Sequence, residues 1–203
     1  MLRAIFVTSS LPHGGAERHA IAVMNGLAQR GHECHAVCIK DSGSRPERIR
    51  LRNRGTVHCL NAARYFDRRA VTAFAAHLSR VQPSVLVAAN PYALMYSRLA
   101  LRISGVRARL VVTFHTTLLQ SVKEWLQMLY YRPFFWTADS LIFVCETQRR
   151  YWLRRGVFAR RNEVIHNGVD TEEFCDRLSP GERASLRSAL GFSDADFVIG
   201  RAA

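Results

Sequence analysis

The chain has 203 residues, of which 48% are hydrophobic and 22% are charged, and it carries a net charge of +13. This composition is typical of a globular protein with a real core and excludes a disordered chain. No apolar run reaches the roughly 18–20 residues that a membrane-spanning helix needs. The positive charge favours an anionic partner, such as a phosphate-bearing substrate, an acidic lipid or a nucleic acid.

The amino terminus and the cysteines bear on location. Residues 1–7 are too few for a secretory signal and lead directly into a strand-like run, so we expect the protein to start in the cytoplasm. The five cysteines are odd in number and lie mostly in apolar runs, which favours reduced thiols over a disulfide framework. They are Cys34, Cys38, Cys59, Cys145 and Cys175.

In the first half of the chain, apolar runs alternate with segments of helical periodicity. The predicted elements are a strand at 4–8, a helix at 16–30 ending before Gly31, a strand at 34–40, an exposed loop at 41–55, a strand at 56–60, a helix at 68–81 and a strand at 84–89. Gly31 follows the first helix because a helix end favours a residue that tolerates a left-handed conformation.

The second half continues the alternation. The predicted elements are a helix at 93–103, a strand at 110–114, a long aromatic-rich helix at 118–136, a strand at 140–145, a helix at 146–155, a strand at 163–165, a helix at 179–190 and the start of a new strand at 197–203. Residues 191–194 between the last two elements predict a linker.

Strands that alternate with helices of ten or more residues predict an α/β fold, a Rossmann-like parallel sheet with helices on both faces. Ligands of such sheets bind at the carboxyl ends of the strands. Candidate site residues are therefore those that follow the strands: Gly14, Gly15, Asn90, His115, Glu146, Asn167 and Gly168.

Gly14 and Gly15 join the first predicted strand to the first predicted helix. Paired glycines let backbone N–H groups approach a ligand, and the start of a helix suits an anion or a sugar hydroxyl. A tight turn that merely needs flexible residues is the alternative. The pattern is neither Gly-x-Gly-x-x-Gly nor a Walker phosphate loop, which argues against a nicotinamide dehydrogenase that uses these glycines and Asp41.

His115 closes a predicted strand. An imidazole there can donate a hydrogen bond to a sugar hydroxyl or a phosphate, or transfer a proton, and a purely structural histidine is the alternative. Asn167 and Gly168 predict a turn, which either only redirects the chain or brings it to a cleft. Cys34 and Cys38 lack metal-ligand spacing and lie in a hydrophobic strand, so we predict no metal and no cofactor.

Two segments bear on surface partners. An arginine-rich stretch predicts either a solvated helix face or a site for acidic lipid, and it contains Arg149, Arg150, Arg154, Arg155, Arg160 and Arg161. Residues 125–136 are apolar nearly all round, which predicts a helix buried between neighbours or one inserted at a membrane surface. Nucleic-acid binding would rest on net charge alone, since no recognised module is visible, so we predict none.

Four stretches, taken together and in order, resemble the retaining glycosyltransferases of the two-domain GT-B fold known as glycosyltransferase family 4. The resemblance covers about residues 1–178. The stretches are Phe6-Val7-Thr8 through Gly14-Gly15-Ala16-Glu17-Arg18, then Val112-Thr113-Phe114-His115, then Val144-Cys145-Glu146, then Val164-Ile165-His166-Asn167-Gly168-Val169-Asp170 with Phe174.

This resemblance implies that the chain is the acceptor-side, N-terminal half of a GT-B fold, and that a second domain binds the nucleotide sugar. Gly14 and Gly15 match the glycine loop that approaches the donor diphosphate, and His115 matches the histidine that contacts the transferred sugar. Arg201 matches an arginine that holds the diphosphate. A lysine and paired glutamates of the family's second domain would lie beyond residue 203.

The resemblance therefore predicts a Rossmann-like domain at 1–191 and, at 192–203, a linker and the first strand of a donor-binding domain. The expected activity is transfer of a sugar from a nucleoside diphosphate sugar to a saccharide or lipid-linked acceptor, at the inner face of an anionic membrane. We expect negligible activity from this chain alone, because stabilising the leaving diphosphate needs the absent groups. A non-catalytic remnant that still binds an acceptor is the alternative.

Overall fold

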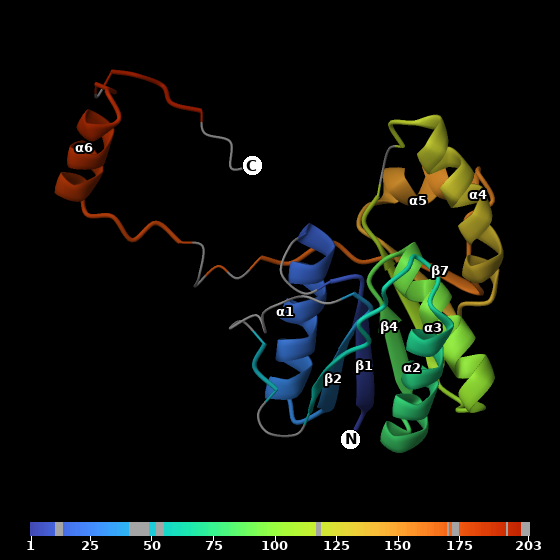
Figure 1. Ribbon diagram of the computed structural model, residues 1–203. Helices are drawn as coiled ribbons and strands as arrows, with labels where there is room; N and C mark the ends of the chain where they lie inside the picture. Colours follow the sequence, from blue (N-terminus) through green and yellow to red (C-terminus); the bar gives the residue numbers. More distant parts are fainter. Residues whose placement is uncertain are drawn as a thin grey trace. The chain divides into compact units, whose positions relative to one another are not determined.

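The structure, a computed structural model, describes residues 1–10, 14–40, 49–51, 55–116, 119–169, 171, 175–193 and 195–199. The chain divides into two compact units, Met1–Asn167 and Gly168–Ala203, and each is described by itself. Figure 1 shows the strands and most of the helices in the first unit. The domain boundary expected between residues 191 and 192 stays a prediction.

The first unit is built on a seven-stranded sheet with the order β3-β2-β1-β4-β5-β6-β7. Each neighbouring pair of strands is parallel. The strands are β1 (Arg3–Thr8), β2 (Glu33–Cys38), β3 (Val57–Cys59), β4 (Val85–Ala88), β5 (Arg109–Phe114), β6 (Ser140–Phe143) and β7 (Arg161–Val164). The predicted α/β parallel sheet is confirmed.

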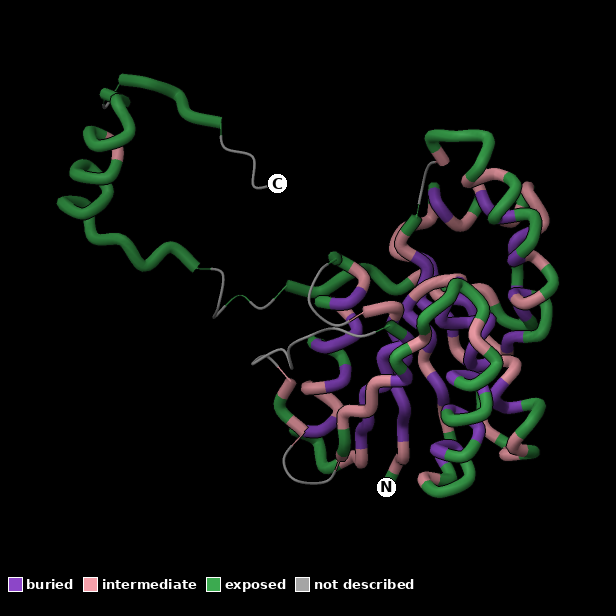
Figure 2. The backbone as a smooth tube through the Cα atoms, in the orientation of Figure 1, coloured by how far each residue is buried: buried purple, intermediate pink, exposed green. Residues whose placement is uncertain are grey.

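Helices cover both faces of this sheet, as predicted. They are α1 (Gly15–Gln29), α2 (Arg68–Val81), α3 (Pro91–Ser104), α4 (Val122–Trp136) and α5 (Glu146–Leu153). Successive strand residues point to opposite faces. Ala4 and Phe6 accordingly pack with α1, whereas Ile5 and Val7 belong to the larger core formed with the other four helices. Figure 2 shows the buried residues along the strands and on the inner sides of the helices.

An aromatic cluster anchors the end of β5. The ring of Phe114, which is fully buried, meets those of Trp152 at 5.2 Å, Phe135 at 5.4 Å and Phe143 at 6.3 Å, all edge to face. Burial of each large side chain stabilises the fold by about 2 kcal/mol, and such ring geometry adds to it. The residue that follows Phe114 is therefore presented by a rigid strand end.

Local capping explains where several helices begin. Helix α2 has the predicted bounds because the Asp67 carboxylate accepts hydrogen bonds from the N–H groups of Arg69 and Ala70. The helix predicted at 118–136 begins later, at Val122, because the Ser121 hydroxyl accepts from the Glu124 N–H and caps it there. Residues 117 and 118 lie outside the described residues.

The second unit contains α6 (Pro180–Ala189), which confirms the helix predicted there. Ser179 and Glu182 form a reciprocal capping box at its start, and the helix has no buried residue. The strand predicted at 197–203 is wrong for its described residues, 197–199, which have no regular structure. A strand needs a hydrogen-bonded neighbour, and these residues pair with none in the described part of the chain.

Candidate functional site

The carboxyl ends of all seven strands meet at one edge of the sheet, which is where a ligand is expected. The strand order reverses direction between β1 and β4. Asn90, which follows β4, bridges this point: its Nδ2 donates to Ser9 Oγ at 2.8 Å, and its Oδ1 accepts from the Ala93 N–H at 2.8 Å. Because both ends of its side chain are engaged, Asn90 holds two loops together at the switch point.

Gly14 and Gly15 form the start of α1 at this edge. Gly14 has φ 135° and ψ 148°, a region that is open essentially to glycine alone. A Cβ at Gly14 would lie 2.2 Å from Glu17 Oε2, whereas one at Gly15 would meet nothing. Both glycines are exposed, so the first N–H groups of the helix can approach an anion. Leu11, Pro12 and His13 lie outside the described residues.

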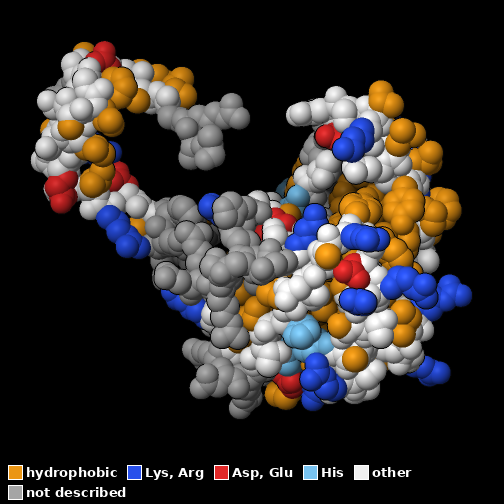
Figure 3. Space-filling model, viewed as in Figure 1, with side chains coloured by type: hydrophobic (Ala, Val, Ile, Leu, Met, Phe, Trp, Pro, Cys, Tyr) orange, Lys and Arg blue, Asp and Glu red, His pale blue; other side chains and the backbone are white. Residues whose placement is uncertain are grey.

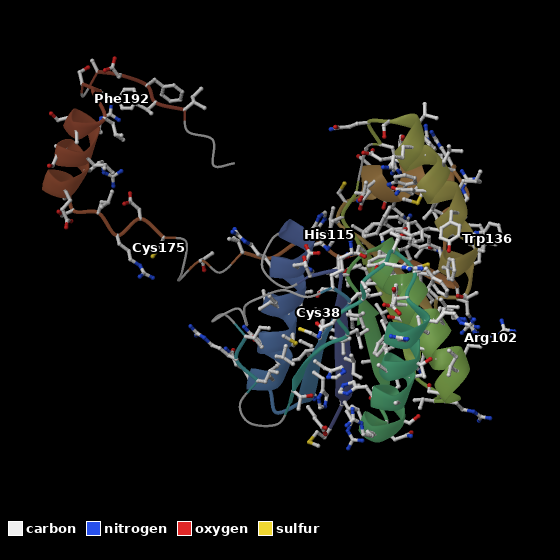
Figure 4. All side chains as sticks on the ribbon, in the orientation of Figure 1. Cys38, Arg102, His115, Trp136, Cys175 and Phe192 are labelled. Carbon is white, nitrogen blue, oxygen red and sulfur yellow. The ribbon has the colours of Figure 1, made fainter. Side chains whose placement is uncertain are left out.

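His115 meets α1 through a second histidine. The ring of His19, one turn beyond Gly15, packs edge to face against that of His115 with 5.1 Å between centroids. Figure 4 shows His115 near the start of α1. His19 Nδ1 and His115 Nε2 are buried and have no hydrogen-bond partner among the described residues. The structure thus brings Gly14, Gly15 and His115 to one edge; their roles in binding or catalysis stay predictions.

Electrostatics keep this histidine pair neutral. Burial lowers the pKa of His19, and burial together with the nearby His19 lowers the pKa of His115. Burial also raises the pKa of Glu17. Thr8 and Thr113 add buried hydroxyls without partners among the described residues. This side of the edge therefore offers buried hydrogen-bonding groups that a ligand or water would satisfy.

A cavity of about 440 Å³ lies beside α3 and α4 and reaches Thr116, the residue after His115. It is lined by Ser9, Asn90, Pro91, Tyr92, Thr116, Leu119, Gln120, Glu124, Gln127, Met128 and Tyr131. Although the chain has a net charge of +13, the described residues that line the cavity include no Lys or Arg, and Glu124 is the one carboxylate among them. Amides, hydroxyls and tyrosine rings suit a neutral ligand that has both hydroxyl groups and an apolar face.

Two residues that the sequence reasoning missed hold the loop after His115. Gln148 Nε2 and Trp152 Nε1 both donate to the Thr116 carbonyl, at 3.1 and 2.8 Å, and Gln148 Oε1 accepts from the Val144 N–H. Both side chains are fully buried. Their spacing of four residues places them on one helix face, and a glutamine on that buried face was the available signal.

The remaining candidates do not join this cluster. Both Glu146 oxygens are engaged within α5, one by Arg149 and one by Arg150, each at 3.1 Å. Asn167 and Gly168 are exposed; Asn167 is the last residue of the first unit and Gly168 is the first residue of the second. Arg201 lies outside the described residues.

The described residues contain no group of three or more His, Cys, Asp or Glu side chains arranged to hold a metal ion. None of the helices in this part of the chain has the length and apolar character needed to cross a membrane.

The sequence profile of Glycosyltransferase Family 4 matches residues 13–173. The chain belongs to this family. No curated protein matches it significantly in sequence.

Among solved structures, HepE of Anabaena in complex with UDP-glucose superposes with a TM-score of 0.73 at 19% identity, covering 94% of this chain and 50% of HepE. Sucrose-phosphate synthase of Thermosynechococcus elongatus gives 0.71 at 17%, covering 95% and 53%. A glycosyltransferase of Rickettsia africae gives 0.66 at 16%, covering 96% and 51%. The family 4 chain therefore spans about half the length of these proteins and shares their fold.

Proposed function

We propose that this family 4 chain is the acceptor-side domain of an enzyme that transfers a sugar, with retention of configuration, from a nucleoside diphosphate sugar to a saccharide or a lipid-linked saccharide. One observation carries the proposal: the open start of α1 and the His19–His115 pair lie together at the carboxyl edge, and each ring has a buried nitrogen without a partner among the described residues. A cavity reaches Thr116, the residue after His115.

On the donor side, the proposed partner of Gly14 and Gly15 is the diphosphate. Exposed N–H groups at a helix start stabilise negative charge, which grows on the diphosphate as the bond to the sugar breaks. Neutral His115 would donate to a sugar hydroxyl, since a neutral imidazole has one donor and one acceptor nitrogen. HepE, which shares the fold, was solved with UDP and with UDP-glucose, and this supports a nucleotide sugar as donor.

On the acceptor side, we propose that the cavity holds a neutral saccharide. Tyr92 and Tyr131 would pack against the apolar face of a sugar ring, while Gln120 and Gln127 would hydrogen-bond to its hydroxyls. The Glu124 carboxylate, which accepts from the Gln120 N–H at 2.7 Å, would disfavour an anionic acceptor.

Transfer would also need a second domain, because the chain spans only half the length of the proteins whose fold it shares. We further propose that the transferred sugar is a hexose. We also propose that the protein contacts an anionic membrane peripherally, which the net charge of +13 supports. A non-catalytic acceptor-binding module is the competing reading of the same cavity.

The test measures release of nucleoside diphosphate from UDP-glucose, UDP-N-acetylglucosamine and GDP-mannose, with mixed neutral saccharides as acceptors. The longest protein that contains this sequence is compared with the 203-residue chain. We expect the longer protein to turn over one donor and the chain alone to show negligible release. Saccharide binding without turnover of any donor by the longer protein would establish the binding module instead.

A further inference from the structure

Helix α4 carries an exposed apolar stripe. Its members follow one another at intervals of four, three, four and three residues, the spacing of one helix face. They are Val122, Leu126, Leu129, Pro133 and Trp136, and we call them the α4 stripe. Val122 is 76% exposed, Leu126 63%, Leu129 54% and Trp136 50%. The residues of α4 that pack in the core lie on a different face of the helix, so the fold does not need the stripe to be buried.

The stripe is a firm surface. The Trp136 ring stacks on Phe158 with 5.8 Å between centroids, and its Nε1 donates to the Gly156 carbonyl at 2.9 Å. Phe158 and Tyr130 are themselves 43% and 53% exposed. Figure 3 shows hydrophobic side chains gathered over α4 on the right of the view. Contiguous exposed apolar surface of this kind marks an interaction site.

A group of arginines lies on the same side of the molecule as the stripe. A second cavity, of about 670 Å³, is lined by Arg98, Arg102, Arg107 and Arg109, and its one acidic residue, Asp139, lies three residues beyond Trp136. Asp139 is already engaged, by the Leu110 N–H at 2.9 Å and by Arg160 at 3.7 Å. Figure 4 shows Arg102 and Trp136 on the same side of the molecule. The cavity thus gathers four arginines with one carboxylate, among the described residues, on the side of the molecule that carries the stripe.

We propose that the α4 stripe and this arginine cavity form a docking surface for an anionic lipid bilayer. Tryptophan and tyrosine suit the headgroup level, leucines the acyl boundary, and arginines the lipid phosphates. A second copy of the chain is disfavoured, because two partners of charge +13 repel one another whereas an anionic bilayer attracts the chain.

The docking surface has a consequence for the acceptor, and this consequence rests on the proposed function. Glu124, Gln127 and Met128 of the same helix line the cavity at Thr116, so α4 carries the stripe on one face and part of that cavity on another. A helix docked in the headgroup layer would therefore hold the cavity beside the membrane surface. A saccharide carried on a lipid is the acceptor that such an arrangement would reach.

The experiment is cosedimentation of the chain with phosphatidylglycerol–phosphatidylcholine vesicles and with pure phosphatidylcholine vesicles. We expect pelleting with the anionic vesicles and at least tenfold weaker partitioning for the L126S/L129S variant. The matched control is L186S/L190S on α6, whose leucines are 49% and 63% exposed, and it should bind like the parent chain. Circular dichroism checks that each variant is folded.

A second experiment tests the arginines. It compares R102Q/R107Q with R68Q/R69Q, which replace exposed arginines and change the net charge equally. The first pair, which borders the arginine cavity, should weaken partitioning several-fold more than the second, which lies at the start of α2. Equal losses would show that only total charge matters and would overturn the arginine part of the surface.

Three results would overturn the proposal as a whole: no pelleting with anionic vesicles, pelleting that L126S/L129S leaves unchanged, or a dimer in solution that L126S/L129S dissociates. Failure here is distinguishable from failure of the proposed function. Leu126 and Leu129 do not line the cavity at Thr116. L126S/L129S in the longer protein should therefore leave nucleoside diphosphate release with a free saccharide unaffected.

Discussion

The two edges of the sheet treat their polar groups differently. At the amino edge, Arg3 binds Glu33 at 2.9 Å and the Val81 carbonyl at 2.7 Å, and the Ser84 hydroxyl donates to the Arg3 carbonyl at 3.0 Å. At the carboxyl edge, His19 Nδ1, His115 Nε2 and the Thr8 and Thr113 hydroxyls have no partner among the described residues.

This difference separates stability from binding. Hydrogen bonds made at the amino edge tie strands and helix ends together and add about 1 kcal/mol each. Buried polar groups left without partners at the carboxyl edge cost stability and are retained where a ligand or water satisfies them. Substitutions at the two edges should therefore have separable effects.

The largest expected effect comes from Gly14→Ala at the carboxyl edge. The side chain would need a backbone region reserved for glycine and would displace Glu17, so we expect a loss of about 1–3 kcal/mol in unfolding free energy and a roughly 100-fold weaker affinity for the nucleotide sugar. Urea unfolding and calorimetric titration of the longer protein measure the two quantities.

Gly31→Ala is the matched control at the opposite end of α1. Gly31 has φ 85° and open space around it, so alanine there should cost about 1 kcal/mol of stability and leave nucleotide-sugar affinity unchanged. Equal losses of affinity in the two variants would erase the distinction between the edges.

His77 is a further buried polar group without a hydrogen-bond partner in the described part of the chain. Its ring packs against those of His35 and His58, but its Nε2 has no partner among the described residues. Burial, followed by these histidines and Arg80, lowers its pKa to about 4. Protonation therefore favours the unfolded chain, and stability present above pH 6.5 is lost as the pH falls toward 4.

We expect the unfolding free energy to fall by roughly 2 kcal/mol between pH 7 and pH 5 through His77. Urea midpoints at the two pH values measure it. His77→Gln should reduce the dependence to the part that His19, His58 and His115 contribute, since burial lowers their pKa values too. His166→Gln, a change at an exposed histidine, should leave it as in the parent chain. An undiminished dependence in His77→Gln would contradict the role of His77.

The sequence predicts the strands and most helices well, because their signals are local. Apolar runs between segments of helical periodicity located the parallel strands, and the helix predicted at 68–81 has the bounds of α2. The glycines and His115 could be placed at one edge because the carboxyl ends of parallel strands meet there.

Contacts between distant segments were beyond local signals. His19 and His115 are 96 positions apart in the chain, and their meeting depends on how α1 lies against the sheet. The bonds from Gln148 and Trp152 to the Thr116 carbonyl depend likewise on packing of α5. For α4, the sequence showed apolar residues nearly all round, but only packing separates the buried Met128, Tyr131 and Phe135 from the exposed stripe.

The most direct test of the central claim is a ¹⁵N NMR titration of the His19 and His115 ring nitrogens in the longer protein with its nucleotide sugar at pH 7. We predict that both rings shift together, with the dissociation constant found by calorimetry, and that Gly14→Ala shifts both curves to higher concentration. Saturation of the protein with nucleotide sugar while both rings stay unperturbed would contradict a sugar-handling site at this edge.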